Sequence, residues 1–202
     1  MSAALLLAAL MAAPPADTLV VGTLADPASI EPHEATDIVA AEIVANVCET
    51  LVRVRPGSLR PEGVLATTWA SPDQRVWTFT LREGVRFQDG ARLDADAVVG
   101  NLEHFRRERA FPGRAERVGP HVVQVTLDRP NAALLSTLSQ PFFALQSPRR
   151  LRGPGSEVPV GTGAFRLESA RPGRVELAAF AEHWAGPPRL RRLVFRRFPD
   201  EG

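Results

Sequence analysis

The spacing of apolar residues along the chain predicts several β-strands. Residues 17–24 form an apolar, β-branched run that has the length of a strand. Residues 76–81 alternate between apolar and polar, as a half-buried strand does, and residues 121–128 alternate in the same way. Three further strand-like segments lie towards the end of the chain, at residues 164–169, 173–180 and 191–198.

Helical periodicity separates these strands. A first helix is expected to begin at Thr36 or Asp37, because apolar residues then recur at every fourth position. These residues are Val39, Ile43, Val47 and Leu51. A second helix is expected from Asp94, where an acidic first turn suits the helix dipole, and its inward residues are Val98, Leu102 and Phe105. With a third helix expected over residues 129–140, the elements lack regular strand–helix–strand alternation, which predicts an α/β fold with a mixed sheet.

Turn-forming residues divide the predicted elements. Pro27 and Pro32 exclude a helix from the loop after the first strand. Asp89 and Gly90 predict a tight turn of the hairpin type. Residues 149–163 are rich in glycine and proline, and we predict a linker there. The two glycines of the sequence GTGAF lack the rest of a phosphate-binding motif, so we expect them to allow a tight turn or a close backbone approach.

The composition is that of a folded protein without a strong charge bias. The hydrophobic fraction is 45% and the charged fraction 23%. All 24 basic residues are arginine, and 23 acidic residues leave a net charge of +1. A dedicated nucleic-acid binder shows a larger basic excess, so we expect no nucleic-acid partner. Cys48 is the only cysteine, so no disulfide can form within the chain, and we interpret it as a small buried side chain.

The first sixteen residues have features of an export signal. An apolar run at residues 3–13 is too short to span a bilayer but suits the hydrophobic region of a secretory signal. No arginine precedes the run and no clean A-x-A cleavage site follows it, so a packed N-terminal helix and a misassigned start are the alternatives. We predict a signal peptide at residues 1–16 and a periplasmic or extracellular protein.

The sequence lacks motifs for catalysis, metal binding and phosphate binding. Its four histidines do not have the spacing of an H-E-x-x-H helix, and no C-x-x-C pair is present. No G-x-S-x-G elbow marks a nucleophilic serine. Asp94 and Asp96 are better explained as the cap and first-turn acid of a helix than as a catalytic pair. We therefore expect no enzyme, no metal site and no cofactor.

Several stretches, taken in order, resemble a known family. They read TLVVGTLADPASIEPHEATD, then NVCETLVRV, then LATTWASPDQRVWTFTLREGVRFQDGARLDADAVVGNLEHF, then VPVGTGAFRLESARPGRVELAAFAEHWAGPPRLRRLVFRRFPD. Together they resemble the family 5 extracellular solute-binding proteins, the peptide, dipeptide and nickel group of ABC importers. The W-T-F-x-L-R-x-G-V-x-F-x-D-G core, followed by D-A-D-A-V, is the most specific part. The resemblance covers about residues 18–200.

The resemblance implies a periplasmic-binding-protein-like fold of type II. Relatives continue past the position of FRRFPD into a second lobe, so we expect a first lobe only, with the second lobe missing. Within it we predict a larger subdomain formed by residues 17–44 and 156–202, and a smaller subdomain inserted at residues 45–155. Such a chain is expected to be a fragment, the product of a split or decayed gene, or a lobe that a second chain completes.

The function that the resemblance implies is capture of a small solute. A two-lobed receptor closes over its ligand and presents it to an ABC permease in the membrane. We therefore expect the substrate-binding component of an ABC importer for peptides or similar small molecules. The alternative is an orphan lobe that acts as an interaction or sensor module completed by another chain.

The residues expected to line the remaining half-site lie in the loop after the first strand and near the end of the first helix. At each position, a plain loop or helix surface is the alternative. The predicted ligand-binding residues are Asp26, Ala28, Ser29, His33, Glu34, Asn46, Cys48 and Glu49. Structural roles are expected for Arg82, Arg86 and Trp184.

Overall fold

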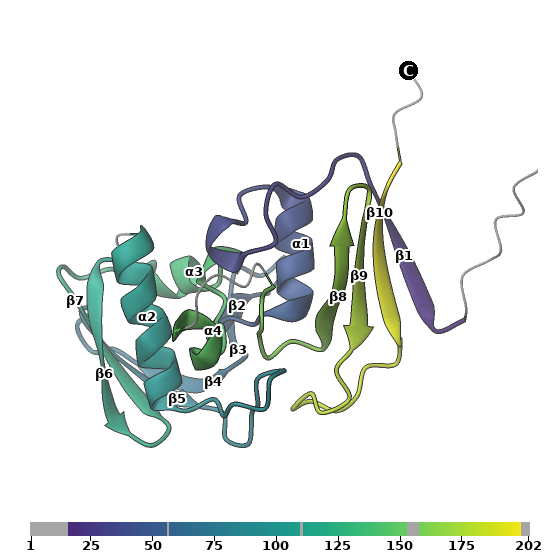
Figure 1. Ribbon diagram of the computed structural model, residues 1–202. Helices are drawn as coiled ribbons and strands as arrows, with labels where there is room; N and C mark the ends of the chain where they lie inside the picture. Colours follow the sequence, from purple (N-terminus) through teal and green to yellow (C-terminus); the bar gives the residue numbers. More distant parts are fainter. Residues whose placement is uncertain (1–15, 56, 110, 153–157, 199–202) are drawn as a thin grey trace, which may run out of the picture.

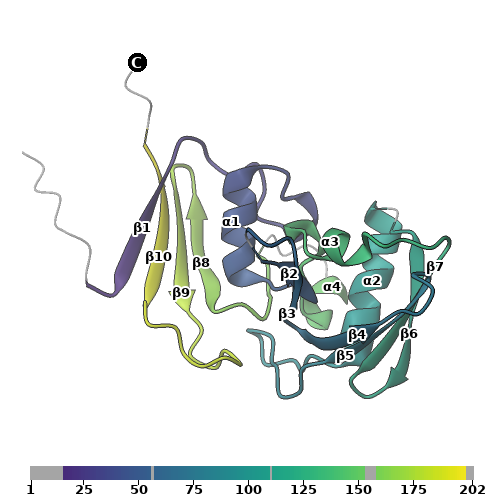
Figure 2. The same cartoon turned by 180° about the vertical axis from the view of Figure 1, so that it is seen from behind.

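The computed structural model describes residues 16–55, 57–109, 111–152 and 158–198. These residues form two four-stranded sheets and one two-stranded ribbon, together with several helices, so the mixed α/β prediction is confirmed. Both views place α1 (Ile38–Val47) between the first sheet and the elements around the second (Figures 1 and 2). The predicted signal peptide lies outside the described residues except at its last position. No helix in the described part of the chain has the length and apolar character needed to cross a membrane.

The first sheet contains one parallel and two antiparallel strand pairs. Its order is β1 (Thr18–Thr23), β10 (Arg192–Arg197), β9 (Arg174–Ala179) and β8 (Phe165–Arg171). β1 runs parallel to β10, so the two strands end at the same edge of the sheet. α1 packs against one face of this sheet, and the first core between them includes Ile43, Val44, Leu177, Leu193 and Phe195.

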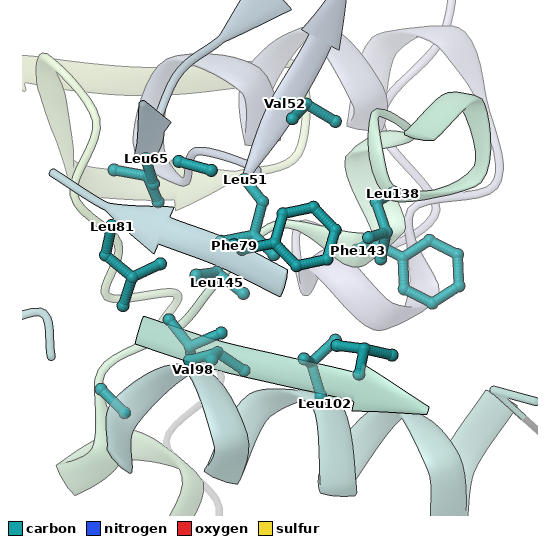
Figure 3. Close-up of a cluster of buried hydrophobic side chains, with 14 of the residues drawn as sticks. Leu51, Val52, Leu65, Phe79, Leu81, Val98, Leu102, Leu138, Phe143 and Leu145 are labelled. Atoms are coloured by element: carbon teal, nitrogen blue, oxygen red, sulfur yellow. The ribbon is translucent and has the colours of Figure 1, made fainter. Parts of the chain in front are cut away.

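The second sheet is antiparallel throughout. Its order is β4 (Ala66–Ala70), β5 (Val76–Leu81), β7 (Val122–Leu127) and β6 (Gly113–Gly119). The alternation in β5 and β7 directs one set of apolar side chains towards α2 (Ala95–Arg109) and builds the second core (Figure 3). Phe79 and Leu102 are fully buried there, and burial of each such side chain contributes about 1.5–3 kcal/mol.

Short elements connect and border the two cores. They are the 3-10 helix η1 (Pro32–Glu34), the ribbon strands β2 (Val52–Val54) and β3 (Pro61–Gly63), α3 (Leu134–Leu138), the 3-10 helix η2 (Pro141–Phe143) and α4 (Pro148–Arg152). η1 lies between β1 and α1 in the chain and contacts both η2 and α2. This loop therefore reaches from the first sheet to the elements of the second core.

Six predicted strands are confirmed as β1, β5, β7, β8, β9 and β10, with small displacements of their ends. β4 and β6 have no counterpart among the predicted strands, and the pairing of Val52–Val54 with Pro61–Gly63 as β2 and β3 was not predicted either. The sequence VRF at residues 85–87 also suggests a short strand, but only an isolated bridge between Arg86 and Arg92 forms there.

The first helix ends earlier than predicted. It stops at Val47, whereas the apolar periodicity continues to Leu51. The Val47 carbonyl accepts hydrogen bonds from the Gly163 N–H at 3.0 Å and from Gln88 Nε2 at 3.1 Å. In a longer helix, this carbonyl would accept from residue 51. Because tertiary partners occupy it, the chain becomes extended at Cys48.

The predicted third helix and the predicted linker are also only partly correct. Of residues 129–140, only Leu134–Leu138 form α3, because the Asn131 side chain accepts from the Ala133 N–H at 2.9 Å and holds a turn before the helix. The linker predicted at residues 149–163 overlaps α4, and its residues 153–157 lie outside the described part of the chain.

Candidate functional site

The candidate site is the loop between β1 and α1. This loop begins at the edge of the first sheet where the parallel strands β1 and β10 both end. In sheets that contain parallel strands, ligands bind beyond the carboxyl ends of those strands. Two hollows border the loop, and Glu34 lines both of them.

Hydrogen bonds from the start of α1 hold this loop in place. Asp37 caps the helix: its Oδ1 accepts from the Ala40 N–H at 2.8 Å, and its Oδ2 accepts from the Ala28 N–H at 2.9 Å. These two bonds, the one from Ala40 first, lower the pKa of the Asp37 carboxyl. Further along the loop, the Ser29 hydroxyl donates to Glu34 Oε2 at 2.9 Å.

Asp26 connects the loop to the first sheet. Its Oδ1 accepts from the Gly173 N–H at 2.8 Å, in the turn between β8 and β9. Its Oδ2 lies 3.2 Å from Arg197 Nη1, at the end of β10. Gly173 has a φ of +78°, which glycine adopts without strain, and this conformation presents its N–H to Asp26.

The first hollow lies between this loop and the β8–β9 hairpin and has a volume of about 870 Å³. Four of the predicted site residues line it: Asp26, Ala28, Ser29 and Glu34. The opposite side is formed in part by Leu167, Glu168, Ser169, Arg171 and Val175. The hollow thus offers apolar contacts together with charged groups of both signs.

The second hollow lies on the other side of Glu34, where η1, α2 and α4 meet, and has a volume of about 400 Å³. Its lining residues are Glu31, His33, Glu34, His104, Glu108, Gln146, Arg150 and Leu151. Two of the predicted site residues, His33 and Glu34, therefore belong to it. His33 is buried, with 8% of its surface exposed, although it follows Pro32 in a surface loop, where an exposed side chain is the common case.

Polar contacts join the groups at the base of the second hollow. Gln146 Nε2 lies 2.9 Å from Glu31 Oε2 and 3.1 Å from His33 Nε2. Arg150 Nη2 forms an ion pair with Glu31 Oε1 at 2.8 Å. The rings of His33 and His104 have their centroids 4.3 Å apart. Burial, as the largest cause, lowers the pKa of His104.

The three site residues predicted near the end of the first helix do not line these two hollows. Asn46 Nδ2 donates to the Glu42 carbonyl at 2.8 Å within the helix. Cys48 is buried, and this burial raises the pKa of its thiol. Cys48 and Glu49 both line a separate hollow of about 300 Å³. The structure therefore brings together five of the eight predicted residues and places the other three apart.

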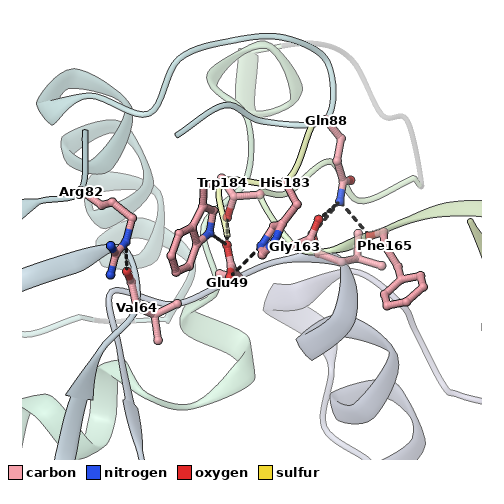
Figure 4. A network of polar contacts seen from close by, with 10 residues as sticks. Glu49, Val64, Arg82, Gln88, Gly163, Phe165, His183 and Trp184 are labelled. Carbon is pink, nitrogen blue, oxygen red and sulfur yellow. Dashed lines mark hydrogen bonds and ion pairs between the residues drawn. The ribbon is translucent and has the colours of Figure 1, made fainter. Parts of the chain in front are cut away.

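The Glu49 carboxylate is engaged within the protein (Figure 4). It accepts from the Thr162 hydroxyl at 2.7 Å and from Trp184 Nε1 at 2.9 Å, and it lies 3.4 Å from His183 Nε2. The Arg82 guanidinium lies over the Trp184 ring, 4.1 Å from its centroid. These contacts give Glu49, Arg82 and Trp184 structural positions between the two cores, and a ligand-binding role for Glu49 stays a prediction.

Several residues of the hollows were not among the predicted site residues. They are Glu31, His104, Glu108, Gln146, Arg150, Glu168 and Arg171. No motif marks them in the sequence, and they come from segments far apart along the chain. Only a prediction that η1 packs against α2 and α4 could have identified the residues of the second hollow.

The groups gathered in the two hollows are suited to binding. They supply hydrogen-bond donors and acceptors, carboxylates, guanidinium groups and apolar surface. Among the described residues, no three His, Cys, Asp or Glu side chains are arranged to hold a metal ion. The arrangement can therefore orient a small polar molecule through hydrogen bonds and ion pairs.

Comparisons with known proteins agree on one group. The family model for bacterial extracellular solute-binding proteins, family 5 (middle region), matches residues 60–202. A glutathione-binding protein GsiB of Salmonella paratyphi A is 32% identical, and the match covers 85% of this chain and 36% of that protein. MoaA of A. tumefaciens R10, solved with mannopinic acid, has a TM-score of 0.83 at 32% identity, covering 92% of this chain and 41% of that one.

A solved nickel ABC transporter protein from Bacillus halodurans gives the same result. Its TM-score is 0.78 at 30% identity, over 91% of this chain and 39% of that chain. The chain thus spans about two fifths of the length of these solved relatives and 36% of the curated one. Its fold is that of a single lobe of a periplasmic-binding-protein-like structure.

Proposed function

The chain belongs to the bacterial extracellular solute-binding proteins, family 5, and on that premise we propose that it forms one wall of a cleft that captures a peptide or similar small solute for an ABC importer. The observation that carries this proposal is the loop between β1 and α1, with a hollow on each side of Glu34. Both hollows are open and lined by polar and charged groups, as the wall of a solute cleft requires.

The proposed ligand class follows from the relatives and from the chemistry of the wall. A relative that binds glutathione and one solved with mannopinic acid both point to small molecules that carry several charged groups. The wall offers carboxylates at Asp26, Glu34 and Glu168 and a guanidinium at Arg171. Such a wall can pair with the ammonium and carboxylate groups of a short peptide.

The two hydrophobic cores support a division into two subdomains, with Val47, Cys48 and Ala144 of the inserted range packing in the first core. One core is built from residues of α1 and the first sheet, and the other from residues of the second sheet and α2. We place the larger subdomain at residues 17–44 and 156–202 and the smaller one at residues 45–155. The contacts of Glu49 and Gln88 then cross the boundary between them.

The setting of this function follows from the family. Family 5 solute-binding proteins are periplasmic or extracellular and are not enzymes. For this chain, we propose the same location outside the cytoplasmic membrane, and an ABC permease in that membrane as its partner.

A thermal-shift titration tests the proposed function. A dipeptide, glutathione and a nickel–histidine complex are added separately at millimolar concentrations, because a single wall binds more weakly than a closed cleft. A solute present at 100 times its Kd stabilises the folded chain by about 2.7 kcal/mol. For a chain of this size that stabilisation raises the Tm by roughly 5–10 °C.

Two variants locate the binding. Glu34→Gln removes the charge shared by both hollows and should reduce the shift, whereas Glu182→Gln, at an exposed position outside them, should leave it unchanged. The proposal is wrong for this chain if no solute raises the Tm, or if the two variants respond alike.

A second candidate function is an interaction module that another chain completes. β1 is an edge strand of the first sheet, and it exposes Leu19 and Val20, at 48% and 37% of their surfaces. An apolar edge strand favours pairing with another chain. Sedimentation of the purified chain distinguishes the two, because a stable dimer without any solute-induced Tm shift would favour this candidate.

A further inference from the structure

The second hollow contains polar groups that the protein itself leaves without partners. Gln146 is 1% exposed, and its Oε1 has no hydrogen-bond partner among the described residues. His104 Nε2 and Arg150 Nε are likewise buried without a partner in the described part of the chain. Buried polar atoms are nearly always hydrogen-bonded, so the two unpartnered acceptors beside one open hollow, Gln146 Oε1 and His104 Nε2, indicate that a further molecule completes them.

The orientation of the Gln146 amide is fixed by its neighbours. One end of the amide lies 2.9 Å from Glu31 Oε2, which only accepts hydrogen bonds when ionised. That end must therefore be the NH₂ group, and the carbonyl oxygen Oε1 is the end left over. Leaving a buried acceptor without a donor costs free energy, so a donor from a bound molecule would be favourable there.

His104 offers a second acceptor. Burial lowers its pKa, so the imidazole is neutral at pH 7, and in the tautomer with the proton on Nδ1 its Nε2 accepts a hydrogen bond. The charged groups that act on His104 are Glu108 and Arg107 on its own helix, Glu31 on the loop and Arg150 on α4.

The charge of the lining favours a cation. Glu31, Glu34 and Glu108 contribute three carboxylates against the single guanidinium of Arg150. Arg150 is already paired with Glu31, and no described ion pair involves Glu34 or Glu108. The two remaining carboxylates leave the hollow with an excess of negative charge and of hydrogen-bond acceptors.

We propose that this hollow binds the protonated amine group of a solute, with Gln146 Oε1, His104 Nε2 and the carboxylate of Glu34 or Glu108 as its acceptors. An ammonium group carries three N–H donors, which matches these three acceptors. A bare divalent cation suits the hollow less, because no trio of metal ligands is preformed among the described residues. The inference adds a ligand class to the proposed function and rests on it for the view that the hollow belongs to a solute-binding wall.

Calorimetry with a matched pair of small probes tests the amine site directly. We expect 1,4-diaminobutane to bind and 1,4-butanediol, which has the same length without charge, not to bind. His104→Phe keeps a ring against His33 and Phe105 and removes the acceptor, so the Kd of the diamine should rise about tenfold. His121→Phe, at a histidine that borders a different hollow, should leave the Kd unchanged.

Glu108→Gln provides a second variant that is not expected to affect folding, because this side chain is exposed. It should raise the Kd of the diamine about two- to fivefold, as the loss of an exposed ion pair does. Circular dichroism confirms that each variant is folded. Equal affinity for the diamine and the diol, or a diamine Kd that neither His104→Phe nor Glu108→Gln changes, overturns the amine site.

A dipeptide and its N-acetylated form separate this inference from the proposed function. If both peptides bind equally well and His104→Phe affects neither, the chain binds solutes but the amine site is wrong. If the diamine binds in a His104-dependent manner while no peptide binds, the amine site stands and peptide capture fails. If neither the diamine nor any peptide binds, both proposals are wrong.

Discussion

The Gln88 side chain should be one of the strongest polar links between the two cores. Its Nε2 lies 3.1 Å from the Val47 carbonyl, 3.1 Å from the Gly163 carbonyl and 2.8 Å from the Phe165 carbonyl (Figure 4). Its Oε1 accepts from the Gly161 N–H at 3.4 Å. The end of α1, the start of β8 and the turn before α2 are therefore all held by one amide.

The expected loss of stability follows from the number of donors removed. Gln88→Ala deletes two N–H donors, each with a net contribution of about 0.5–1.5 kcal/mol, so unfolding should become easier by about 1–3 kcal/mol. For a chain of this size, the Tm should fall by roughly 2–12 °C. Gln88→Glu should be worse than Gln88→Ala, because the carboxylate oxygen that replaces Nε2 would face three carbonyl oxygens without any donor.

Urea unfolding followed by circular dichroism measures these differences. Gln124→Ala is the matched control, since Gln124 Nε2 makes only an exposed contact with Glu116, and its change should stay within about 0.5 kcal/mol. The reasoning is refuted if Gln88→Ala is as stable as wild type, or if Gln88→Glu is as stable as Gln88→Ala at pH 7.

Two further predictions concern the backbone around α1 and the cap of that helix. Gly161→Ala should destabilise the chain by about 1–3 kcal/mol, because the new Cβ would collide with the Val47 carbonyl and lie 2.6 Å from Cys48 Sγ. The control is Gly100→Ala, in an exposed helical position with open space around it, which should stabilise the chain by up to about 1 kcal/mol. Equal Tm values for the two variants would contradict this prediction. Asp37→Ala should cost about 0.5–2 kcal/mol at pH 7 through loss of the helix cap. Because the folded-state pKa of Asp37 is lowered, its contribution is present above its ordinary pKa of 3.8 and is lost as the pH falls through the lowered value. Urea titrations at pH 7 and pH 3 should therefore show a smaller difference from wild type at pH 3, and a constant difference would exclude this role.

Local sequence patterns were sufficient to predict the strands that show clear apolar alternation. β5 and β7 alternate along their whole length, and the structure buries the predicted face of each. β6 does not alternate, because most of its side chains are exposed at the edge of the sheet, so its pairing with β7 leaves no periodic signal in the sequence. The two glycines of GTGAF were correctly expected to allow a close approach, although the partner backbone at Val47 could not be identified.

The candidate site could likewise be predicted only in part from the sequence. The loop after the first strand could be predicted from its prolines and from the family resemblance, and five of its residues do line the two hollows. The contacts of Glu49 could not be predicted in this way, because its partners Thr162, His183 and Trp184 follow more than a hundred residues later in the chain.

The sequence by itself determined the class of fold, the principal strands and helices, and the family, because these depend on periodicity and on ordered local motifs. The tertiary structure alone decided where α1 ends and which side chains surround each hollow. The end of α1 depends on which donor forms a hydrogen bond with the Val47 carbonyl. The second hollow depends on the contacts of Gln146 and Arg150 with a loop that lies more than a hundred residues earlier in the chain. Such contacts arise from packing between distant segments, and no local pattern encodes them.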